Sequence, residues 1–415
     1  MTATTLKKIT GNAGALLIIQ LANALLPLVL APYLTRVLGK EGYGLFALGI
    51  ALIQVATIFT DYGFGLSAVY QIARAKQNNG RIRRIAGAVY ASKLTICLVI
   101  AAGIFVYPLL QHSYSEHRIY FWLLSLSVVG MTLQPVWLFQ GIERMRLITG
   151  YVVFSRLSFV ALTLLLVKGP DDLERVALFN GLTHIAAAVI ALIFVSRSGY
   201  WPIWPGMRYT LQILRSSTGY FWSRLAVVSY GAGAILFLGT FSSASQVALY
   251  SVAEQFYRGA LAVYSPVTQA LYPHMARYRD VLLFKKLFKI VLALACFGII
   301  SGLALGKWLI ALLFGADYEQ SYTVFVVFML ALAVAIPSIL LGYPFLGAMG
   351  NPSAANRSVL FAGFVQLITL GMLWIYGWTS ALAVVVAVLI AEISALVWRV
   401  RYALPYFKIT KSQRN

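Results

Sequence analysis

The chain has 415 residues, of which 60% are hydrophobic and only 11% are charged. A soluble globular protein carries about 25% charged residues, so this chain lacks the polar residues needed to cover two or three soluble domains. The 24 Phe, 24 Tyr and 9 Trp residues exclude a disordered chain, because so many aromatic side chains must be buried. The composition therefore predicts a protein that lies in a lipid bilayer.

Most of the few charged residues are basic, with 33 Lys and Arg against 12 Asp and Glu. The basic residues fall between apolar segments and do not line one face of a domain, which argues against a nucleic-acid partner. Anionic lipid headgroups are the expected partner instead. The two cysteines, Cys97 and Cys296, lie inside apolar segments and imply no disulfide framework.

In chain order, twelve segments are long and apolar enough for transmembrane helices, each of which needs about 20 mainly apolar residues. No small-residue cleavage site follows a brief apolar core at the N-terminus, so we expect a retained first span and not a signal peptide. The last two spans are separated only by Gly377–Thr379 and together are too long for one crossing. The predicted spans are Ala13–Leu34, Gly44–Ala73, Ile85–Leu110, Ile119–Phe139, Leu147–Val167, Val176–Val195, Thr218–Phe241, Val247–His274, Phe288–Phe314, Tyr322–Leu346, Val359–Tyr376 and Ser380–Trp398.

The basic residues of the connecting segments give the predicted orientation. One set of alternate connections, which includes both terminal tails, carries 23 Lys and Arg, and the other set carries 5. Cytoplasmic segments carry the excess of positive charge in membrane proteins, so we expect both termini in the cytoplasm. Because the longest connection is only Ser196–Ser217, no connection has room for a soluble domain, and we expect the functional groups inside the membrane.

The two halves of the chain carry similar landmarks. The segment Gly44–Ala47 opens the second predicted span and Ala248–Ser251 opens the eighth, and each of these long spans is followed by a segment with five basic residues. The offset of six spans predicts parallel repeats. The fold class is then an all-α polytopic membrane protein, with twelve transmembrane helices in two six-helix lobes around a central cavity. The expected parts are lobes 1–196 and 218–398, a cytoplasmic linker 197–217 and a basic cytoplasmic tail 399–415.

Ionisable side chains within the spans are the candidate functional residues, because each costs several kcal/mol in the membrane unless it is paired or hydrated. Asp61, Arg156 and Arg258 lie near the middle of their spans, and Arg224 lies closer to the cytoplasmic end. Arg156 and Arg224 have no acidic residue in their own spans, which makes them candidates for an anion site. Asp61 must find a partner on another helix or be protonated.

Glu254 and Arg258 are four residues apart and therefore share one face of a helix. A structural salt bridge and a role in transport both remain open for this pair, and the same alternatives apply to Asp61. We expect Lys93 to extend to the cytoplasmic headgroups. His184 lies in mid-span, where a hydrogen-bonded packing role is the commoner one, and Glu392 is expected to pair with Arg399 or another neighbour.

Some classes of function are disfavoured by what the sequence lacks. No G-x-x-x-x-G-K-[ST] segment is present, so the chain has no nucleotide-driven motor of that type. No Cys/His cluster suggests a metal, and no cofactor is expected. No long outer loop with paired carboxylates is present, which argues against a membrane glycosyltransferase, polymerase or ligase.

Three segments resemble the Wzx-type polysaccharide repeat-unit flippases of the multidrug/oligosaccharidyl-lipid/polysaccharide (MOP) exporter superfamily. They are Arg36–Leu45 (RVLGKEGYGL) after the first span, Trp137–Met145 (WLFQGIERM) after the fourth, and Ala270–His274 (ALYPH) at the end of the eighth. The Trp137–Met145 segment is the most specific of the three. The resemblance also extends over the whole chain, in the number of spans, the cytoplasmic termini and the six-plus-six repeat.

The resemblance implies a transporter and not an enzyme. Its cargo would be an undecaprenyl-pyrophosphate-linked oligosaccharide, moved from the cytoplasmic to the periplasmic leaflet of a bacterial inner membrane by alternating access. O-antigen units are the expected cargo, followed by capsule or another exopolysaccharide, and a polysaccharide polymerase and chain-length proteins are the implied protein partners. Arg156, Arg224 and Arg258 would bind the pyrophosphate or sugars. Asp61 and Glu254 are the candidates for coupling to H⁺ or Na⁺.

Two rival functions remain. A MATE-like multidrug or cation exporter of the same superfamily would have the same spans, but lipophilic cations favour an acidic site, and three intramembrane arginines point the other way. A membrane polysaccharide polymerase or ligase should carry long outer loops, which this chain lacks.

Overall fold

The protein is helical throughout the part of the chain that its computed structural model describes. That part comprises the backbone of residues 3–75 and 78–412, with the side chains of residues 29–75, 78–111, 113–222, 224, 225, 228 and 231–407. The side chains of most of the first predicted span lie outside it. The helices are α1 (Ala3–Asp61), α2 (Phe64–Arg74), α3 (Asn79–Leu110), η1 (His112–His117), α4 (Arg118–Leu133), α5 (Val136–Gly141), α6 (Met145–Leu166), η2 (Pro170–Asp172), α7 (Leu173–Arg197), α8 (Met207–Tyr230), α9 (Ala232–Phe241), α10 (Ala244–Tyr278), α11 (Val281–Phe314), η3 (Ala316–Tyr318), α12 (Ser321–Leu340), η4 (Leu341–Gly347), α13 (Pro352–Ile375) and α14 (Ala381–Ser412).

The chain is a multi-pass membrane protein by the length and apolar character of its helices. Nine segments of the described residues are long and apolar enough to cross a bilayer. They are Val29–Arg74, Asn79–Leu110, Ser113–Gly141, Met145–Leu166, Pro170–Arg197, Val281–Phe314, Ser321–Gly347, Pro352–Ile375 and Ala381–Phe407.

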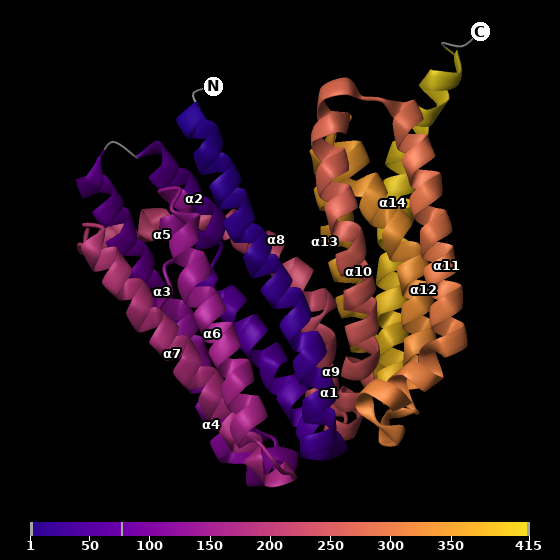
Figure 1. The fold of residues 1–415 in the computed structure, drawn as a ribbon, viewed down its shortest axis with the longest axis horizontal. Coiled ribbons are helices and arrows are strands. Elements are labelled where there is room, and N and C mark those ends of the chain that lie inside the picture. The colour runs from indigo at the N-terminus through magenta and orange to yellow at the C-terminus, as the bar shows by residue number, and fades with distance from the viewer. Residues whose placement is uncertain (1–2, 76–77, 413–415) are drawn as a thin grey trace. The chain divides into compact units, whose positions relative to one another are not determined.

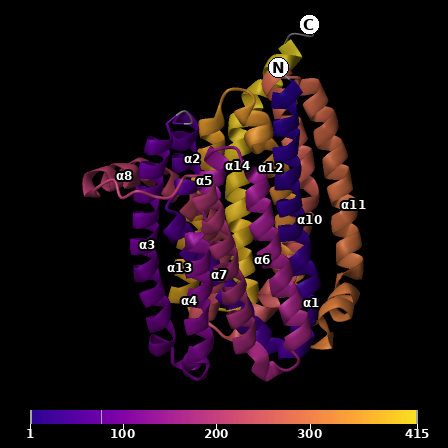
Figure 2. The same ribbon diagram turned by 60° about the vertical axis from the view of Figure 1, so that its left-hand side comes forward.

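The contacts between residues divide the chain into two compact units. The first unit comprises residues 1–42 and 49–228, and the second comprises residues 43–48 and 229–415. In the first unit α4 packs against α7 and α3, α6 packs against α7, and α2 packs against α5. In the second unit α14 packs against α12 and α13, and α12 also packs against α10 and α11. Figures 1 and 2 show the helices of each unit side by side as a bundle.

Small residues permit close packing of α4 against α7 in the first unit. A Cβ atom at Gly130 would lie 2.7 Å from the backbone carbon of His184, and one at Gly181 would lie 2.6 Å from the side chain of Leu126. Membrane helices associate through such close packing because lipid gives little hydrophobic driving force between them. The two helices thus fix the position of His184.

The segments that carry the family resemblance have structural roles. Gly39 has φ 68°, outside the helical region, and interrupts α1 between the first and second predicted spans. Gly44 lies against the Ala244 carbonyl of α10, where a Cβ atom would approach to 1.9 Å. Trp137 and Phe139 of α5 are fully buried, and Gly141 lies against Ile72 of α2. These residues hold helices together and contribute no charge to a binding site.

Four predicted spans are interrupted in the structure where the sequence analysis treated each as one segment. The breaks fall at Tyr62–Gly63, at Gln134–Pro135, at Gly231 and within η4 at Gly342. The helix that leads into the seventh predicted span also begins earlier than expected, at Met207 in the predicted linker, and Figure 2 shows its start projecting sideways from the first unit. Broken helices at membrane depth are tolerated only where protein or water satisfies the freed backbone groups.

Candidate functional site

Asp61 lies at the point where α1 ends and α2 begins. Tyr62 has φ 43° and Gly63 has φ 81°, so the chain turns sharply, and the left-handed geometry suits the glycine. The Asp61 carboxylate then accepts a hydrogen bond through Oδ2 from the backbone N–H of Gly65, at 3.4 Å. An acidic side chain is favourable at this position because the N-terminus of a helix carries partial positive charge.

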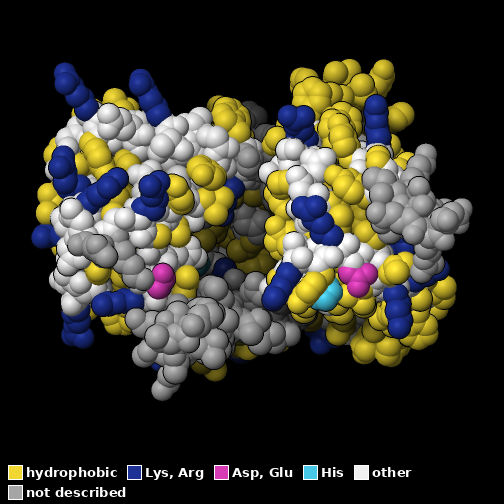
Figure 3. All heavy atoms as spheres, turned by 90° about the horizontal axis from the view of Figure 1, so that it is seen from above, with side chains coloured by type: hydrophobic (Ala, Val, Ile, Leu, Met, Phe, Trp, Pro, Cys, Tyr) yellow, Lys and Arg dark blue, Asp and Glu magenta, His cyan; other side chains and the backbone are white. Residues whose placement is uncertain are grey.

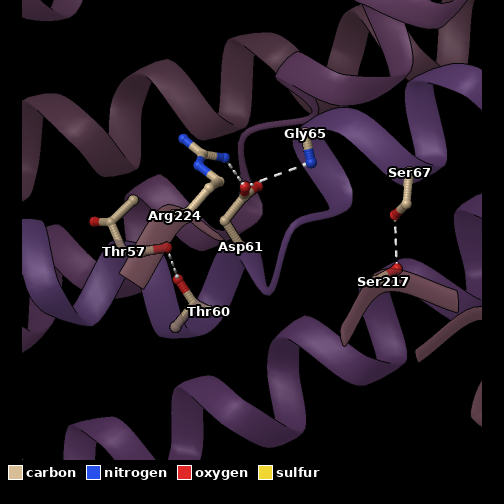
Figure 4. A network of polar contacts seen from close by, with 7 residues as sticks. All are labelled: Thr57, Thr60, Asp61, Gly65, Ser67, Ser217 and Arg224. Carbon is tan, nitrogen blue, oxygen red and sulfur yellow. Dashed lines mark hydrogen bonds and ion pairs between the residues drawn. The ribbon is translucent and has the colours of Figure 1, made fainter. Parts of the chain in front are cut away.

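Arg224 of α8 forms an ion pair with Asp61, through Nη1 and the same carboxylate oxygen (Figure 4). The predicted span of Arg224 contains no acidic residue, and the structure supplies one from another helix. It also places Arg224 in the first compact unit, although the predicted lobe boundaries assign this residue to the second lobe. The carboxylate side chain is 16% exposed and the arginine side chain is 40% exposed.

A ladder of polar contacts joins α2 to α8 next to the ion pair. The hydroxyls of Ser67 and Ser217 are 2.6 Å apart, and Gln71 Nε2 donates to Ser216 Oγ at 3.2 Å (Figure 4 shows the serine pair). At the chain turn, the ring of Tyr62 stacks on Phe221 with 4.7 Å between centroids. These contacts keep α8 against the broken helix and so position Arg224.

Gly65 leaves the space that the Asp61–Arg224 pair occupies. A Cβ atom built on Gly65 would lie 3.1 Å from Arg224 Nη1 and 3.1 Å from Asp61 Oδ2. Such a distance is tighter than an ordinary van der Waals contact between carbon and these atoms. A larger residue at this position would therefore push on both partners of the pair.

The second unit contains the ion pair that the sequence predicted. Arg258 Nη2 lies 2.9 Å from Glu254 Oε1, one turn apart on α10, which confirms the expected pair. The glutamate side chain is 9% exposed and the arginine side chain is 47% exposed. Gly231, at the break between α8 and α9, makes room for the guanidinium, since a Cβ atom there would lie 2.5 Å from Nη2.

Glu392 of α14 accepts a hydrogen bond from the hydroxyl of Tyr257, at 3.2 Å. We expected Glu392 to pair with Arg399 or another neighbour, and the hydrogen-bond partner is the neighbour Tyr257. Arg399 itself donates to Ser358 Oγ at 2.8 Å and to Ser338 Oγ at 2.9 Å. In the second unit, Glu392 and Arg399 are therefore both hydrogen-bonded to neutral hydroxyl groups.

Arg156 of α6 is a cation without an acidic partner among the residues that the structure describes. It interacts electrostatically with His184 of α7. His184 is 8% exposed, and its Nδ1 lies 3.3 Å from Gln134 Nε2 and 3.4 Å from Ser155 Oγ. Because an amide N–H can only donate, Nδ1 is the acceptor, and the histidine has the hydrogen-bonded packing role expected for it.

Lys93 of α3 corrects one expectation from the sequence. We expected its side chain to extend to the cytoplasmic headgroups, but the residue is only 4% exposed, so that prediction is wrong. It interacts electrostatically with Asp61 and Arg224. Lys93 is thus a cation enclosed within the first unit.

Sequence reasoning overlooked the glycines beside the ion pairs, Gly65 and Gly231, and the true position of Lys93. One signal was available for the first, because Asp61-Tyr62-Gly63 is a turn sequence inside an apolar segment. Within the described residues, no group of three His, Cys, Asp or Glu side chains lies close enough together to hold a metal ion. The arrangement instead offers exposed guanidinium groups, each held at one side by a carboxylate.

The comparisons with known proteins agree with the sequence resemblance. The family described as "Polysaccharide biosynthesis protein" matches residues 9–279. Two curated proteins named "Putative O-antigen transporter" are similar to the chain. The one from Escherichia coli (strain K12) is 30% identical over 76% of this chain and 78% of its own length, and the one from Shigella dysenteriae is 26% identical over 92% and 96%.

Among solved structures, the lipid II flippase MurJ in an inward closed conformation has the same fold. Its TM-score is 0.70 at 12% identity, covering 94% of this chain and 86% of that one. A MATE family multidrug resistance transporter of the MOP superfamily follows, with a TM-score of 0.61 at 14% identity and 95% of both chains covered. The chain therefore belongs to the polysaccharide biosynthesis protein family and has the fold of the MOP superfamily exporters.

Proposed function

We propose that this protein is a flippase that moves undecaprenyl-pyrophosphate-linked oligosaccharides, most directly O-antigen repeat units, from the cytoplasmic to the periplasmic leaflet of a bacterial inner membrane. The family and the name shared by two curated relatives support polysaccharide transport. The fold is that of membrane exporters. The protein accordingly acts as a transporter and makes or breaks no covalent bond.

The exposed arginines carry the proposal. Arg224 and Arg258 keep 40% and 47% of their side chains uncovered by protein, while their carboxylate partners are largely covered. A guanidinium held on one side by a carboxylate still has donors free for a second anion, because it carries five N–H groups in a planar fork. The pyrophosphate of the cargo is such an anion, and charge-assisted contacts of this kind are the strong ones. Arg156 is the third proposed contact for the cargo; it is partly buried and has no acidic partner among the described residues.

We further propose a twelve-span topology in two six-helix lobes, with both termini cytoplasmic and alternating access of the lobes to the two leaflets. In Figure 3, Lys and Arg side chains are spread over one end of each unit, where few Asp and Glu side chains are visible. That distribution supports a cytoplasmic assignment for this end. A polysaccharide polymerase and chain-length proteins are the proposed partners at the periplasmic side.

Coupling to H⁺ or Na⁺ is proposed through Asp61 and Glu254. Asp61 lies at the break between α1 and α2 and Glu254 lies within α10, and each carboxylate forms an ion pair with an arginine. A proton or sodium ion that binds the carboxylate would free the arginine for cargo. Transport of cargo and movement of the ion would then be linked through a shared guanidinium.

The second candidate function, export of multidrug or other lipophilic cations, rests on the likeness to the MATE transporter. It predicts a site in which acidic side chains are exposed. The opposite holds for the two ion pairs here, since the carboxylates are covered and the arginines are exposed. This contrast favours an anionic cargo.

The proposal is tested by deleting the gene in its native host. The surface polysaccharide is then measured, together with the lipid-linked units on the cytoplasmic face. We expect loss of surface polysaccharide and accumulation of lipid-linked units, both restored by the intact gene. Unchanged surface polysaccharide would overturn the proposed function, and resistance lost to cationic drugs instead would favour the multidrug alternative.

A further inference from the structure

The segment that leads into α8 exposes large apolar side chains at the surface of the first unit. Trp201 and Trp204 are 51% and 59% exposed, and Ile203, Met207 and Leu211 are exposed as well. So many uncovered apolar side chains in one short segment mark an interaction surface. Tryptophan is enriched where a membrane meets water, because its ring is apolar and its N–H is polar.

Hydrogen bonds fix this 201–211 segment to α3. The Ile203 N–H donates to the Arg83 carbonyl at 3.1 Å, and Arg83 Nε donates to the Trp201 carbonyl at 3.0 Å. Gly87 permits the close approach, since a Cβ atom there would lie 2.0 Å from the Ile203 carbonyl oxygen. The apolar side chains are therefore held at a defined place on the unit.

The contact with α3 also indicates the depth of the segment in the membrane. Residues 88–110 of α3, beyond Gly87, are about 34 Å long at 1.5 Å per residue, and the hydrocarbon core of a bilayer is about 30 Å thick. The 201–211 segment thus lies at one end of the membrane-crossing part of α3, at the level of the headgroups. Figure 2 shows the start of α8 running across the direction of α3, which is the orientation of a helix in the plane of the interface.

Basic side chains accompany the apolar ones. Arg208 is exposed and has no hydrogen bond or ion pair of its guanidinium among the described residues. At about 100° per residue it shares one side of α8 with Met207 and Leu211. Arg84 of α3 is also exposed and lies over the ring of Tyr209, 5.5 Å from its centroid. Residues 74–87 and 197–217 contain no Asp or Glu, so the chemistry of this surface fits an anionic and partly apolar partner.

We propose that the 201–211 segment is an interfacial anchor that binds anionic phospholipids. The indole rings and the apolar side chains of the segment enter the layer between the headgroups and the acyl chains, and the Arg208 guanidinium pairs with lipid phosphate. This inference goes beyond the proposed function, because it does not depend on the cargo. The anchor holds the start of α8, the helix that carries Arg224 to Asp61.

The test measures tryptophan fluorescence of the purified full-length protein in nanodiscs of phosphatidylcholine with a minority of phosphatidylglycerol. Bromine atoms, which quench indole fluorescence on contact, are placed near the headgroup end of the acyl chains. They are carried either by the phosphatidylglycerol or by an equal amount of the phosphatidylcholine. The contribution of the two rings is the difference between the wild-type protein and the Trp201→Phe/Trp204→Phe variant.

We expect brominated phosphatidylglycerol to quench this contribution about fivefold more than brominated phosphatidylcholine, which corresponds to the ~1 kcal/mol of one basic residue at an anionic surface. Arg208→Gln should abolish the preference and Arg208→Lys should keep it. Arg118→Gln is the matched control, because Arg118 is an exposed arginine of the first unit that begins α4, beyond the other end of α3. It should leave the preference unchanged.

Two rings that neither brominated lipid quenches, but that iodide quenches from the water, would overturn the anchor and favour a protein partner at this surface. Equal quenching by the two lipids would overturn the binding of anionic phospholipids. A preference that persists in Arg208→Gln would overturn the assignment of the phosphate to Arg208. The proposed function stands or falls on surface polysaccharide in the deletion strain, so the two proposals fail independently.

Discussion

Asp61 and Arg224 lie 163 positions apart in the chain and form an ion pair between the end of α1 and α8. The pair connects a break in one helix to a helix that continues into the other compact unit. Its carboxylate oxygen Oδ2 is shared by two donors, Arg224 Nη1 and the Gly65 N–H. The pair therefore ties α8 to the point where the chain turns from α1 into α2.

Replacing Arg224 should separate the need for charge from the need for the planar fork. Arg224→Lys keeps the charge and should retain part of the export, whereas Arg224→Ala and Arg224→Glu should abolish it, because Asp61 loses its partner and the cargo loses a cation. Export is measured as surface polysaccharide in the deletion strain, at matched membrane levels of each variant. Arg215→Ala, at an exposed position of the same helix, is the control and should be neutral. Full export by Arg224→Ala would exclude Arg224 from the site.

Exchanging Glu254 and Arg258 distinguishes structural support from cargo binding. The double variant rebuilds the ion pair on α10 but moves the cation one helical turn, about 5.4 Å. We expect the double variant to reach higher membrane levels than Glu254→Arg or Arg258→Glu alone. We do not expect it to restore export, because the guanidinium no longer lies beside Gly231. Full surface polysaccharide in the exchanged variant would show that Arg258 only supports the helix.

Alanine at Gly65 should weaken export through the ion pair next to it. The added methyl group would lie 3.1 Å from both Arg224 Nη1 and Asp61 Oδ2, so the pair must shift by a few tenths of an ångström. Gly103→Ala on α3 is the matched control, because a Cβ atom there meets nothing within 4 Å. Both variants are assayed for surface polysaccharide and for thermal unfolding in detergent. Equal behaviour of the two would mean that the space beside the pair is unimportant.

Removing the hydroxyl of Tyr257 should destabilise the second unit. Tyr257→Phe leaves the partly buried Glu392 without its 3.2 Å donor, and the loss of such a hydrogen bond costs about 1 kcal/mol. The expected result is a lower unfolding temperature, partly restored when Glu392→Gln is added, because the amide carries less charge to leave unpaired. Tyr264→Phe on the same helix has no such partner among the described contacts and serves as control. An unchanged unfolding temperature for Tyr257→Phe would show that water replaces the hydroxyl.

The sequence was sufficient for an all-helical, multi-pass membrane fold and for one of the two ion pairs described in the candidate site. Glu254 and Arg258 could be paired because helical spacing alone brings residues four apart onto one face. Asp61 and Arg224 could not, because their contact depends on the turn at Gly63 and on the packing of α8 against α2, which one sequence does not specify. The prediction for Lys93 was wrong for a related reason. A lysine near the end of a span normally extends to the interface, and only the tertiary fold shows that this one is enclosed.

The division of the chain into units has a consequence for how the protein is made. Residues up to 228 belong to the first unit, whereas residues 43–48 belong to the second. During synthesis, the first unit therefore cannot be completed until α8 has left the ribosome. The 43–48 segment waits for the synthesis of α10, because Gly44 packs against Ala244, about 200 residues later in the chain. Early insertion intermediates thus carry unfilled helix contacts, which are the surfaces that a membrane chaperone would bind.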